Sequence, residues 1–187
     1  LFDGYKKGLR AGETEFSLWN LLSYVAMVPY LLGRPLQQIL EDCPPAMIQF
    51  EEAASSGHIL DLRVLMQMFT NLSEPSCADP SSLEGSYFSK TNDDFQEARV
   101  HVAIAHFAES ELLMFSGDYV TAADRAIALG EVHTELVPGI YTVMYETCHR
   151  AIVLYAAALK TNKKKYKVHA KRIRNKVAKW AKAGNPN

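Results

Sequence analysis

The sequence predicts an all-α fold. Apolar residues recur at spacings of three, four and seven along most of the 187 residues, and this spacing lines one face of a helix. No stretch shows the two-residue alternation of a half-buried strand, so we expect no β-sheet. Hydrophobic residues make up 48% of the chain, which is enough for a substantial core, and the length fits one domain covering residues 1–187.

The first half of the sequence predicts several helices in succession. A helix over residues 1–10 is broken at Ala11-Gly12, and a strongly apolar helix follows from Glu13 to Leu32, with Pro29 expected to kink its last turn. Pro35 opens the next helix, which we expect Pro44-Pro45 to end while starting another. A further helix is predicted after Gly57.

Residues 73–92 lose the helical periodicity. The stretch is rich in Ser, Pro, Asp, Asn and Gly and has few apolar residues, so we predict a long loop with a short turn around Leu83.

The clearest supersecondary signal lies between residues 93 and 130. An amphipathic run ends at Phe115, and a second helix rich in alanine starts after Gly117-Asp118-Tyr119. Gly117 suits the left-handed end of a helix, and Asp118 can cap the start of the next one. We therefore predict two antiparallel helices joined by a tight turn, with small residues that allow their backbones to approach closely.

The last third of the sequence predicts two long helices. The first runs from Ile140 to Leu159 after a turn at Pro138-Gly139, and the second spans about residues 163 to 183, with apolar residues from Tyr166 to Trp180 on one face.

Charge is distributed very unevenly along the chain, although the net charge is −1. Residues 1–159 carry nine Lys/Arg and all 21 Asp/Glu, a net charge of −12, whereas residues 160–187 carry eleven Lys/Arg and no acidic residue. The basic amphipathic helix within residues 160–183 is therefore a candidate binding surface. Its candidate partner-binding residues are Lys163, Lys164, Lys165, Lys167, Lys171, Arg172, Arg174, Lys176, Lys179 and Trp180.

Two interpretations of this basic helix remain open. It could bind anionic lipid, nucleic acid or a calmodulin-like partner. It could equally bury its apolar face in its own domain and expose the basic face to solvent, which is what amphipathic helices usually do. Trp180 distinguishes the two, because it is buried only in the second.

The sequence motifs predict no catalytic residue, no cofactor site and no metal site. The phosphate-binding patterns G-x-x-x-x-G-K-[ST] and G-x-G-x-x-G do not occur. Glu146 and His149 form a single Glu-x-x-His motif, whereas di-iron bundles use two such motifs and two further Glu residues. We expect Glu146 and His149 to face solvent, and Glu109 to be buried and paired.

The cysteines and the chain start suggest a cytoplasmic setting and a longer parent chain. Cys43, Cys77 and Cys148 are odd in number and have no motif spacing, so we expect a reducing, cytoplasmic compartment. The longest apolar run, near Leu18 to Leu32, is interrupted by polar residues and is shorter than a membrane span. The chain begins with Leu1, and the following residues are typical of the inside of a helix, so we expect a fragment.

Two sets of short motifs resemble known helical families. Gly117-Asp118-Tyr119, with Ala122 three residues further on, resembles the turn of a tetratricopeptide repeat, although the Trp and the early Gly of that pattern are missing. The order of motifs along the chain resembles the helical region that follows the nucleotide-binding module in large multidomain signalling ATPases. These motifs are Leu9 to Phe16, Gly33-Arg34-Pro35-Leu36, Asn71-Leu72, Asp79-Pro80, Leu83-Glu84-Gly85 and the closing Trp180-Ala181 with Asn185-Pro186-Asn187.

This second resemblance implies antiparallel helical hairpins stacked as a degenerate tetratricopeptide-like array. It implies a non-catalytic scaffold in a larger signalling ATPase or kinase, with other protein modules of the same parent chain as partners. Pro29 and the run after Ser73 depart from the family pattern. Anionic-surface or calmodulin-like binding through residues 160–182 is the alternative function.

Overall fold

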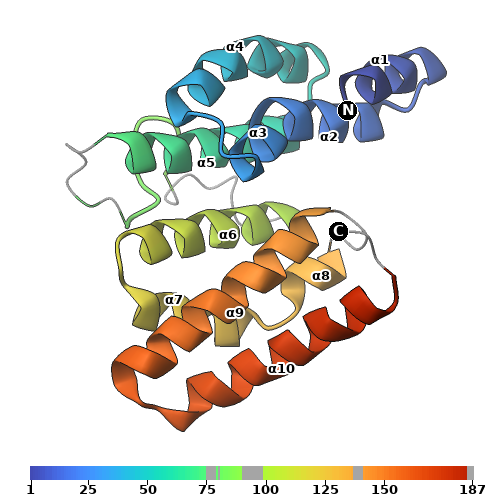
Figure 1. Ribbon diagram of the computed structural model, residues 1–187. Helices are drawn as coiled ribbons and strands as arrows, with labels where there is room; N and C mark the ends of the chain where they lie inside the picture. Colours follow the sequence, from blue (N-terminus) through green and yellow to red (C-terminus); the bar gives the residue numbers. More distant parts are fainter. Residues whose placement is uncertain (75–78, 80, 90–98, 137–140, 185–187) are drawn as a thin grey trace. The chain divides into compact units, whose positions relative to one another are not determined.

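The computed structural model is all-helical, which confirms the predicted fold class (Figure 1). It describes residues 1–74, 79, 81–89, 99–136 and 141–184, and no β-strand occurs among them. The chain divides into two compact units, Leu1–Ala108 and Glu109–Asn187, and the boundary falls within helix α6 (Arg99–Phe115). The prediction of a single domain over residues 1–187 stays a prediction.

The first unit is built from paired helices. Helices α1 and α2 pack together, α4 packs on α5, and α2 also contacts both α4 and α5. Phe50, Phe69 and Leu62 are among the completely buried side chains of this core. The helices of this unit are α1 (Phe2–Ala11), α2 (Thr14–Leu22), η1 (Ser23–Met27), α3 (Val28–Leu31), α4 (Leu36–Glu52) and α5 (Ser56–Ser73).

The predicted helix from Glu13 to Leu32 contains a π-helical segment, η1, that the sequence did not reveal. Pro29 lies one residue into α3, directly after this segment. Proline has no N–H and its ring crowds the carbonyl of the preceding turn. The π-helical turn before Pro29 is therefore where the helix departs from regular geometry, one turn earlier than predicted.

The prediction that Pro44-Pro45 separates two helices is wrong, because α4 runs without a break through both prolines. The two proline rings are exposed, so water can bond the carbonyls that lose their helical partners. Cys43 and Ala46 on either side are buried, and their packing holds the helix in place.

Of the predicted loop 73–92, Ser73 belongs to α5, residues 75–78, 80 and 90–92 lie outside the described residues, and residues 81–89 form no helix, as predicted. The stretch 81–89 is anchored more firmly than its composition indicates. Leu83 and Phe88 are buried. Asn71 donates a hydrogen bond to the Ser82 carbonyl at 2.5 Å, and the Tyr87 N–H donates to Gln67 at 2.9 Å. Two polar side chains of α5 therefore hold the loop against the unit.

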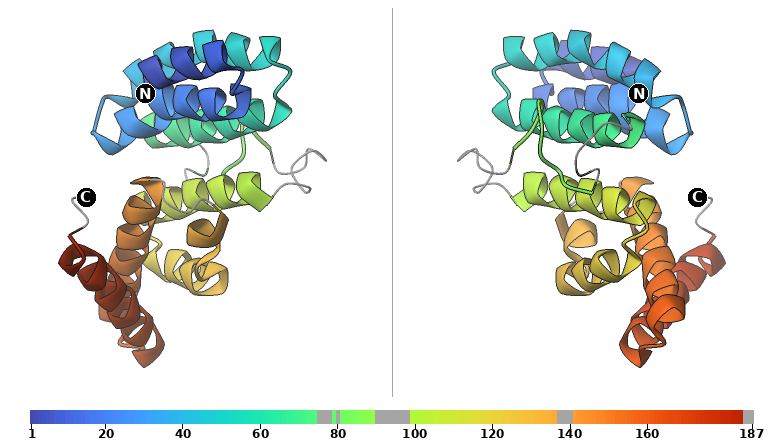
Figure 2. Two further views of the ribbon diagram at one scale, coloured as in Figure 1. Left: turned by 90° about the vertical axis from the view of Figure 1, so that its right-hand side faces the viewer. Right: turned by 90° about the vertical axis from the view of Figure 1, so that its left-hand side faces the viewer.

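The second unit is a set of helices packed around α9. Helix α9 contacts α7, α8 and α10, and the two side views of Figure 2 show α9 and α10 side by side. Besides the end of α6, the helices are α7 (Tyr119–Leu129), α8 (Val132–Leu136), α9 (Tyr141–Thr161) and α10 (Lys164–Lys182). The expected turn at Pro138-Gly139 and the start of the predicted hairpin at residues 93–98 lie outside the described residues.

The turn at Gly117-Asp118-Tyr119 is confirmed. Gly117 has a φ of 82°, and the Asp118 N–H bonds to the Leu113 carbonyl at 2.9 Å, which closes the end of α6. The Asp118 side chain accepts a hydrogen bond from the Thr121 N–H and so caps α7. The predicted close approach of the α6 and α7 backbones is not found: Leu113 of α6 packs with Ala122 and Ala126, but the extensive helix–helix contact of α7 is with α9.

Candidate functional site

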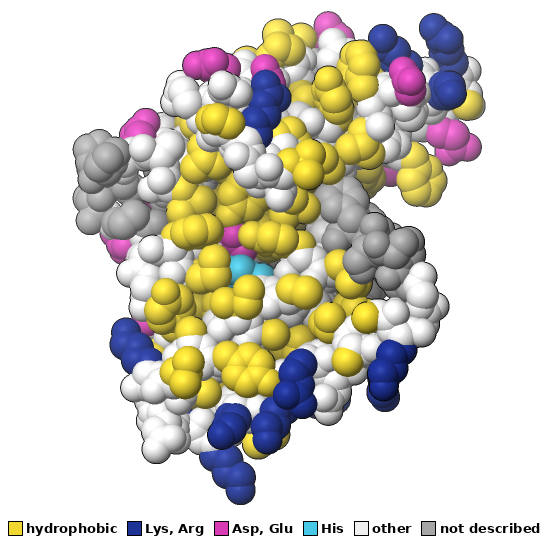
Figure 3. Space-filling model, viewed as in Figure 1, with side chains coloured by type: hydrophobic (Ala, Val, Ile, Leu, Met, Phe, Trp, Pro, Cys, Tyr) yellow, Lys and Arg dark blue, Asp and Glu magenta, His cyan; other side chains and the backbone are white. Residues whose placement is uncertain are grey.

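The first unit contains an apolar groove of about 960 Å³ that the sequence did not predict. Helix α1 contributes Phe2 and Tyr5 to it, and α2, η1 and α3 contribute a row of apolar side chains. Figure 3 shows hydrophobic side chains, in yellow, over α3 and α4 among charged ones. The lining residues are Phe2, Tyr5, Leu21, Tyr24, Val25, Val28, Pro29, Leu32, Gly33, Arg34, Glu41, Asp42, Pro45, Ala46 and Gln49.

The irregular parts of two helices shape this groove. The π-helical segment η1 supplies Tyr24 and Val25, and two prolines within helices, Pro29 of α3 and Pro45 of α4, also line the groove. A π-helical turn changes the direction of the side chains that follow it, and such turns often occur at functional sites. The signal that could have located the groove is therefore the pair of prolines within apolar helices.

Aromatic side chains make up the α1 side of the groove. The Phe2 ring stacks on the Tyr24 ring at 5.1 Å between centroids, and the Tyr5 hydroxyl donates a hydrogen bond to Gln49 at 2.9 Å. These contacts link α1 to both η1 and α4. Leu32 and Tyr24 are nevertheless well exposed, with 80% and 49% of their surface accessible.

A few polar side chains accompany the apolar lining. Arg34 forms a salt bridge of 2.7 Å with Asp42, and Glu41 lies beside them on α4. The groove thus combines a large apolar surface with a slightly negative group of charges, which is typical of sites that bind apolar ligands in one orientation.

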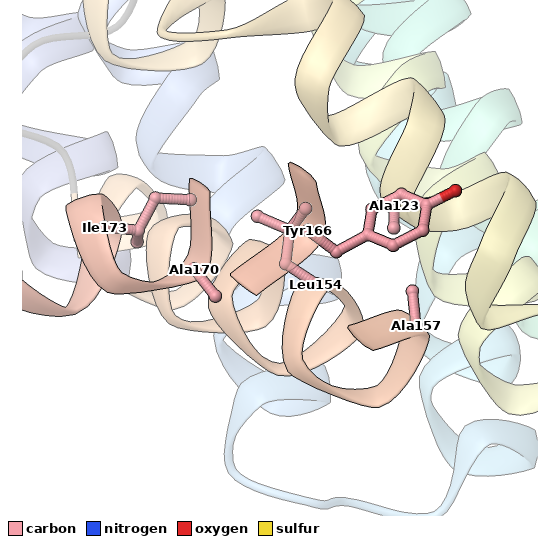
Figure 4. Close-up of a cluster of buried hydrophobic side chains, with 6 residues drawn as sticks. All are labelled: Ala123, Leu154, Ala157, Tyr166, Ala170 and Ile173. Carbon is pink, nitrogen blue, oxygen red and sulfur yellow. The ribbon is translucent and has the colours of Figure 1, made fainter. Parts of the chain in front are cut away.

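The predicted partner-binding helix 160–183 corresponds to α10, and its apolar face is buried. Tyr166, Ala170 and Ile173 pack against Leu154 and Ala157 of α9 and Ala123 of α7 (Figure 4). Trp180 is half-buried, with the Lys176 ammonium 4.8 Å from the centre of its ring. A calmodulin-like partner needs such an apolar face to be accessible, and α10 presents its own inward.

The structure separates the basic residues of α10 into two groups. Lys165 forms a salt bridge of 2.6 Å with Asp124, and Lys176 is paired with Glu131. The others are exposed and have no acidic partner among the described residues, and Figure 3 shows Lys and Arg side chains, in dark blue, gathered over this helix. They are Lys164, Lys167, Lys171, Arg172, Arg174, Lys179 and Lys182 of α10, and Lys163 directly before it.

Glu146 and His149 do not face solvent as expected. His149 is buried and its Nε2 lies 2.9 Å from Glu111, which also accepts a hydrogen bond of 3.0 Å from the Tyr145 hydroxyl. Glu146 instead forms a salt bridge of 2.7 Å with Arg150, and burial raises the pKa of this carboxyl group. The two side chains therefore have different partners.

Glu109 and Cys43 are two further buried side chains. Glu109 is buried and paired with Arg125, as predicted. Cys43 is also buried, and burial together with the charge of Asp42 raises the pKa of its thiol to about 12, so it is not a thiolate nucleophile at neutral pH. Among the residues that the structure describes, no three His, Cys, Asp or Glu side chains are grouped as metal ligands.

Asp61 and His101 form a polar pair inside the first unit. The Nδ1 atom of His101 lies 2.6 Å from Asp61, whose side chain is buried, and this hydrogen bond raises the pKa of His101. Gly57 makes the pair possible, because a Cβ atom there would lie only 2.8 Å from the His101 ring. The pair joins α5 to α6.

Comparison with protein-family models, with curated proteins and with solved structures found no match to this chain. The resemblance to the helical region of signalling ATPases stays a prediction. No helix in the described ranges has the length and hydrophobicity needed to cross a membrane.

Proposed function

We propose that this chain is a non-catalytic, helical protein-interaction region that binds an amphipathic helix of a partner protein in the groove lined by α1, η1, α3 and α4. The observation that carries the proposal is the groove itself, whose lining is mostly apolar. Helix-in-groove recognition uses such a surface, with apolar side chains of the ligand at helical spacing as anchors.

A protein segment fits the surroundings of the groove better than a small molecule does. Three of the lining side chains, Leu32, Tyr24 and Phe2, are themselves exposed, so the apolar surface of the groove faces outward. A continuous apolar patch of this kind marks an interaction surface, because water contact with it is unfavourable. A helix can fill the groove and cover the exposed faces of these three side chains.

Charge adds a preference for the sequence of the ligand. Asp42 is already paired with Arg34, whereas Glu41 beside it accepts a hydrogen bond of 3.4 Å from the Gln37 amide and forms no salt bridge within the described residues. A lysine or arginine next to the last apolar anchor of the ligand would complement Glu41. We therefore assign the groove to a helix with apolar anchors and a basic end.

The proposal includes the wider context suggested by the sequence. The helices would be a degenerate tetratricopeptide-like array, and the parent protein would be a large signalling ATPase or kinase whose other modules supply the partner. What supports this part is the order of short motifs along the chain and the Gly117 turn.

Fluorescence anisotropy with a labelled peptide tests the groove. The peptide is a helix of about 16 residues, with leucines on one face and lysine at one end. Binding should be saturable and should weaken about tenfold or more in a Tyr24→Ser/Leu32→Ser variant, since both side chains are exposed anchors at the groove.

A matched control separates the groove from general hydrophobicity. Phe16 and Ile48 are also exposed and lie outside the groove in the same unit, so the Phe16→Ser/Ile48→Ser variant should bind the peptide as the unaltered protein does. Absence of saturable binding, or equal weakening by the two double variants, would refute the proposal.

A further inference from the structure

A second cavity, of about 590 Å³, lies in the other unit where the end of α9 meets the start of α10. The connection between these helices is a tight turn: Asn162 has a φ of 54°, and the Lys163 N–H donates to the Thr161 hydroxyl at 3.3 Å. Asparagine tolerates this left-handed conformation better than most residues. The cavity is therefore bordered by two helices in a fixed arrangement, and its lining residues are Tyr155, Ala158, Leu159, Asn162, Lys163, Lys164, Lys167, Val168 and Lys171.

The charges that line this cavity are all positive. Four lysines line it and no acidic side chain does. Within the described part of the chain, none of these four lysines forms a salt bridge, whereas Lys165 and Lys176 of the same helix each have an acidic partner. Like charges held close together repel one another, so an anionic ligand would relieve the repulsion.

Exposed apolar side chains accompany these lysines. Leu159 is 86% exposed and Val168 is 54% exposed, and Tyr155 of α9 contributes part of its ring to the cavity. Most of Leu159 and more than half of Val168 are therefore free to contact a ligand. The ligand should therefore have an apolar group next to its negative charges.

We propose that this cavity binds an acidic segment of a partner protein in which glutamate or aspartate residues flank an apolar anchor. The anchor would contact Leu159, Val168 and Tyr155, and the acidic residues would pair with Lys164, Lys167 and Lys171. The site belongs to a different unit from the α1–α4 groove, and the proposal does not depend on that groove.

The shape of the site favours a protein segment over the other anionic partners. A bilayer surface is broad and flat, whereas these lysines and apolar side chains border a hollow. Recognition of single-stranded nucleic acid uses exposed aromatic faces, and the tryptophan of α10 is half-buried beneath Lys176. A protein segment can place one apolar side chain in this hollow and its acidic side chains next to the lysines that border it.

Fluorescence anisotropy with two labelled peptides of equal charge tests the proposal. One peptide, of about 12 residues, has glutamates on both sides of two leucines, and in the other serine replaces the leucines. The full chain should bind the first peptide saturably at low salt, bind the second at least tenfold more weakly, and lose affinity for the first as salt is raised, because salt screens the charges.

Two variants with the same change in net charge locate the site. Lys164→Gln/Lys167→Gln/Lys171→Gln alters the cavity, and Arg172→Gln/Arg174→Gln/Lys179→Gln alters exposed residues of the same helix outside it. The first variant should weaken binding of the leucine peptide at least tenfold and the second less than twofold. Circular dichroism should show the same helix content in all three proteins, since every altered side chain is exposed.

Three outcomes would overturn the proposal: no saturable binding of the leucine peptide, equal binding of the two peptides, and equal weakening by the two triple variants. If the leucine peptide does not bind, binding of phosphatidylserine vesicles or of duplex DNA through the same lysines would identify a lipid surface or a nucleic acid as the ligand instead. The Tyr24→Ser/Leu32→Ser variant should bind the acidic peptide normally, so failure here and failure at the α1–α4 groove are distinguishable.

Discussion

Replacing Tyr166 by alanine tests whether α10 is an integral part of the second unit. Tyr166 is completely buried, and its ring packs with Leu154 and Ala157 of α9 and with Ala123 of α7 (Figure 4). The side chain thus connects three helices. Its truncation leaves a cavity at their common contact.

The size of the effect follows from this burial. Truncation of a fully buried aromatic side chain to alanine destabilises a protein by about 3–5 kcal/mol, because transfer free energy is lost and a cavity remains. In a chain of this length each kcal/mol lowers the melting temperature by roughly 2–4 °C. We therefore expect the melting transition that involves the second unit to fall by about 6–20 °C.

Urea unfolding followed by circular dichroism measures the change. The control is Val168→Ala on the same helix, where the side chain is 54% exposed and the expected change is below about 0.5 kcal/mol. A loss of less than about 1 kcal/mol in the Tyr166→Ala protein would show that α10 is not packed as described. It would also reopen the interpretation in which the apolar face of α10 is free to bind a partner.

Four other substitutions also have measurable expected effects on stability. Gly57→Ala should destabilise the protein by about 2 kcal/mol in urea unfolding, because the new Cβ would push His101 away from the buried carboxylate of Asp61. The control is Gly4→Ala, where the new Cβ makes only ordinary van der Waals contacts and should not destabilise the protein. Burial lowers the pKa of His133 to about 4, so between about pH 4 and 6.5 the unfolded chain binds a proton at this residue that the folded chain does not. This makes stability rise with pH, and His133→Gln should make the rise smaller, while the contribution of His58, whose pKa burial also lowers, remains. The raised pKa of His101 acts in the opposite sense: its stabilisation is present below pH 6.5 and is lost as the pH rises through the pKa of His101 in the folded protein. If His101→Gln and the unaltered protein showed the same dependence of unfolding free energy on pH, this assignment would be contradicted. Asp118→Ala should cost about 0.5–2 kcal/mol by removing the cap of α7 while Asp118→Asn retains most of it, and equal losses would show that the cap is unimportant.

The helices with strong local signals were predictable from sequence. The range predicted for α10, about residues 163 to 183, differs by one residue at each end from Lys164–Lys182, because its apolar residues repeat regularly on one face. The Gly117-Asp118 turn was also predictable, since glycine and aspartate have well-defined roles at helix ends.

Features that depend on tertiary packing were not predictable. Local rules place a helix end at Pro44-Pro45, but burial of Cys43 and Ala46 keeps α4 continuous. The groove was missed for the same reason. Its lining comes from several helices, and hydrophobic periodicity within each helix does not specify how the helices pack on one another. The contact between His149 and Glu111 joins α9 to α6, and a helical spacing rule describes only pairs on one helix.

Methyl-detected NMR of the leucine-, valine- and isoleucine-labelled protein tests the proposed function most directly. On titration with the amphipathic helical peptide, we expect the resonances of Leu21, Val25, Val28 and Leu32 to shift, since these side chains line the groove. The resonances of Ile48, which is exposed outside the groove, should stay unchanged. No shifts at the groove methyls, or shifts at Ile48 of equal size, would contradict the assignment of this groove as the partner-binding site.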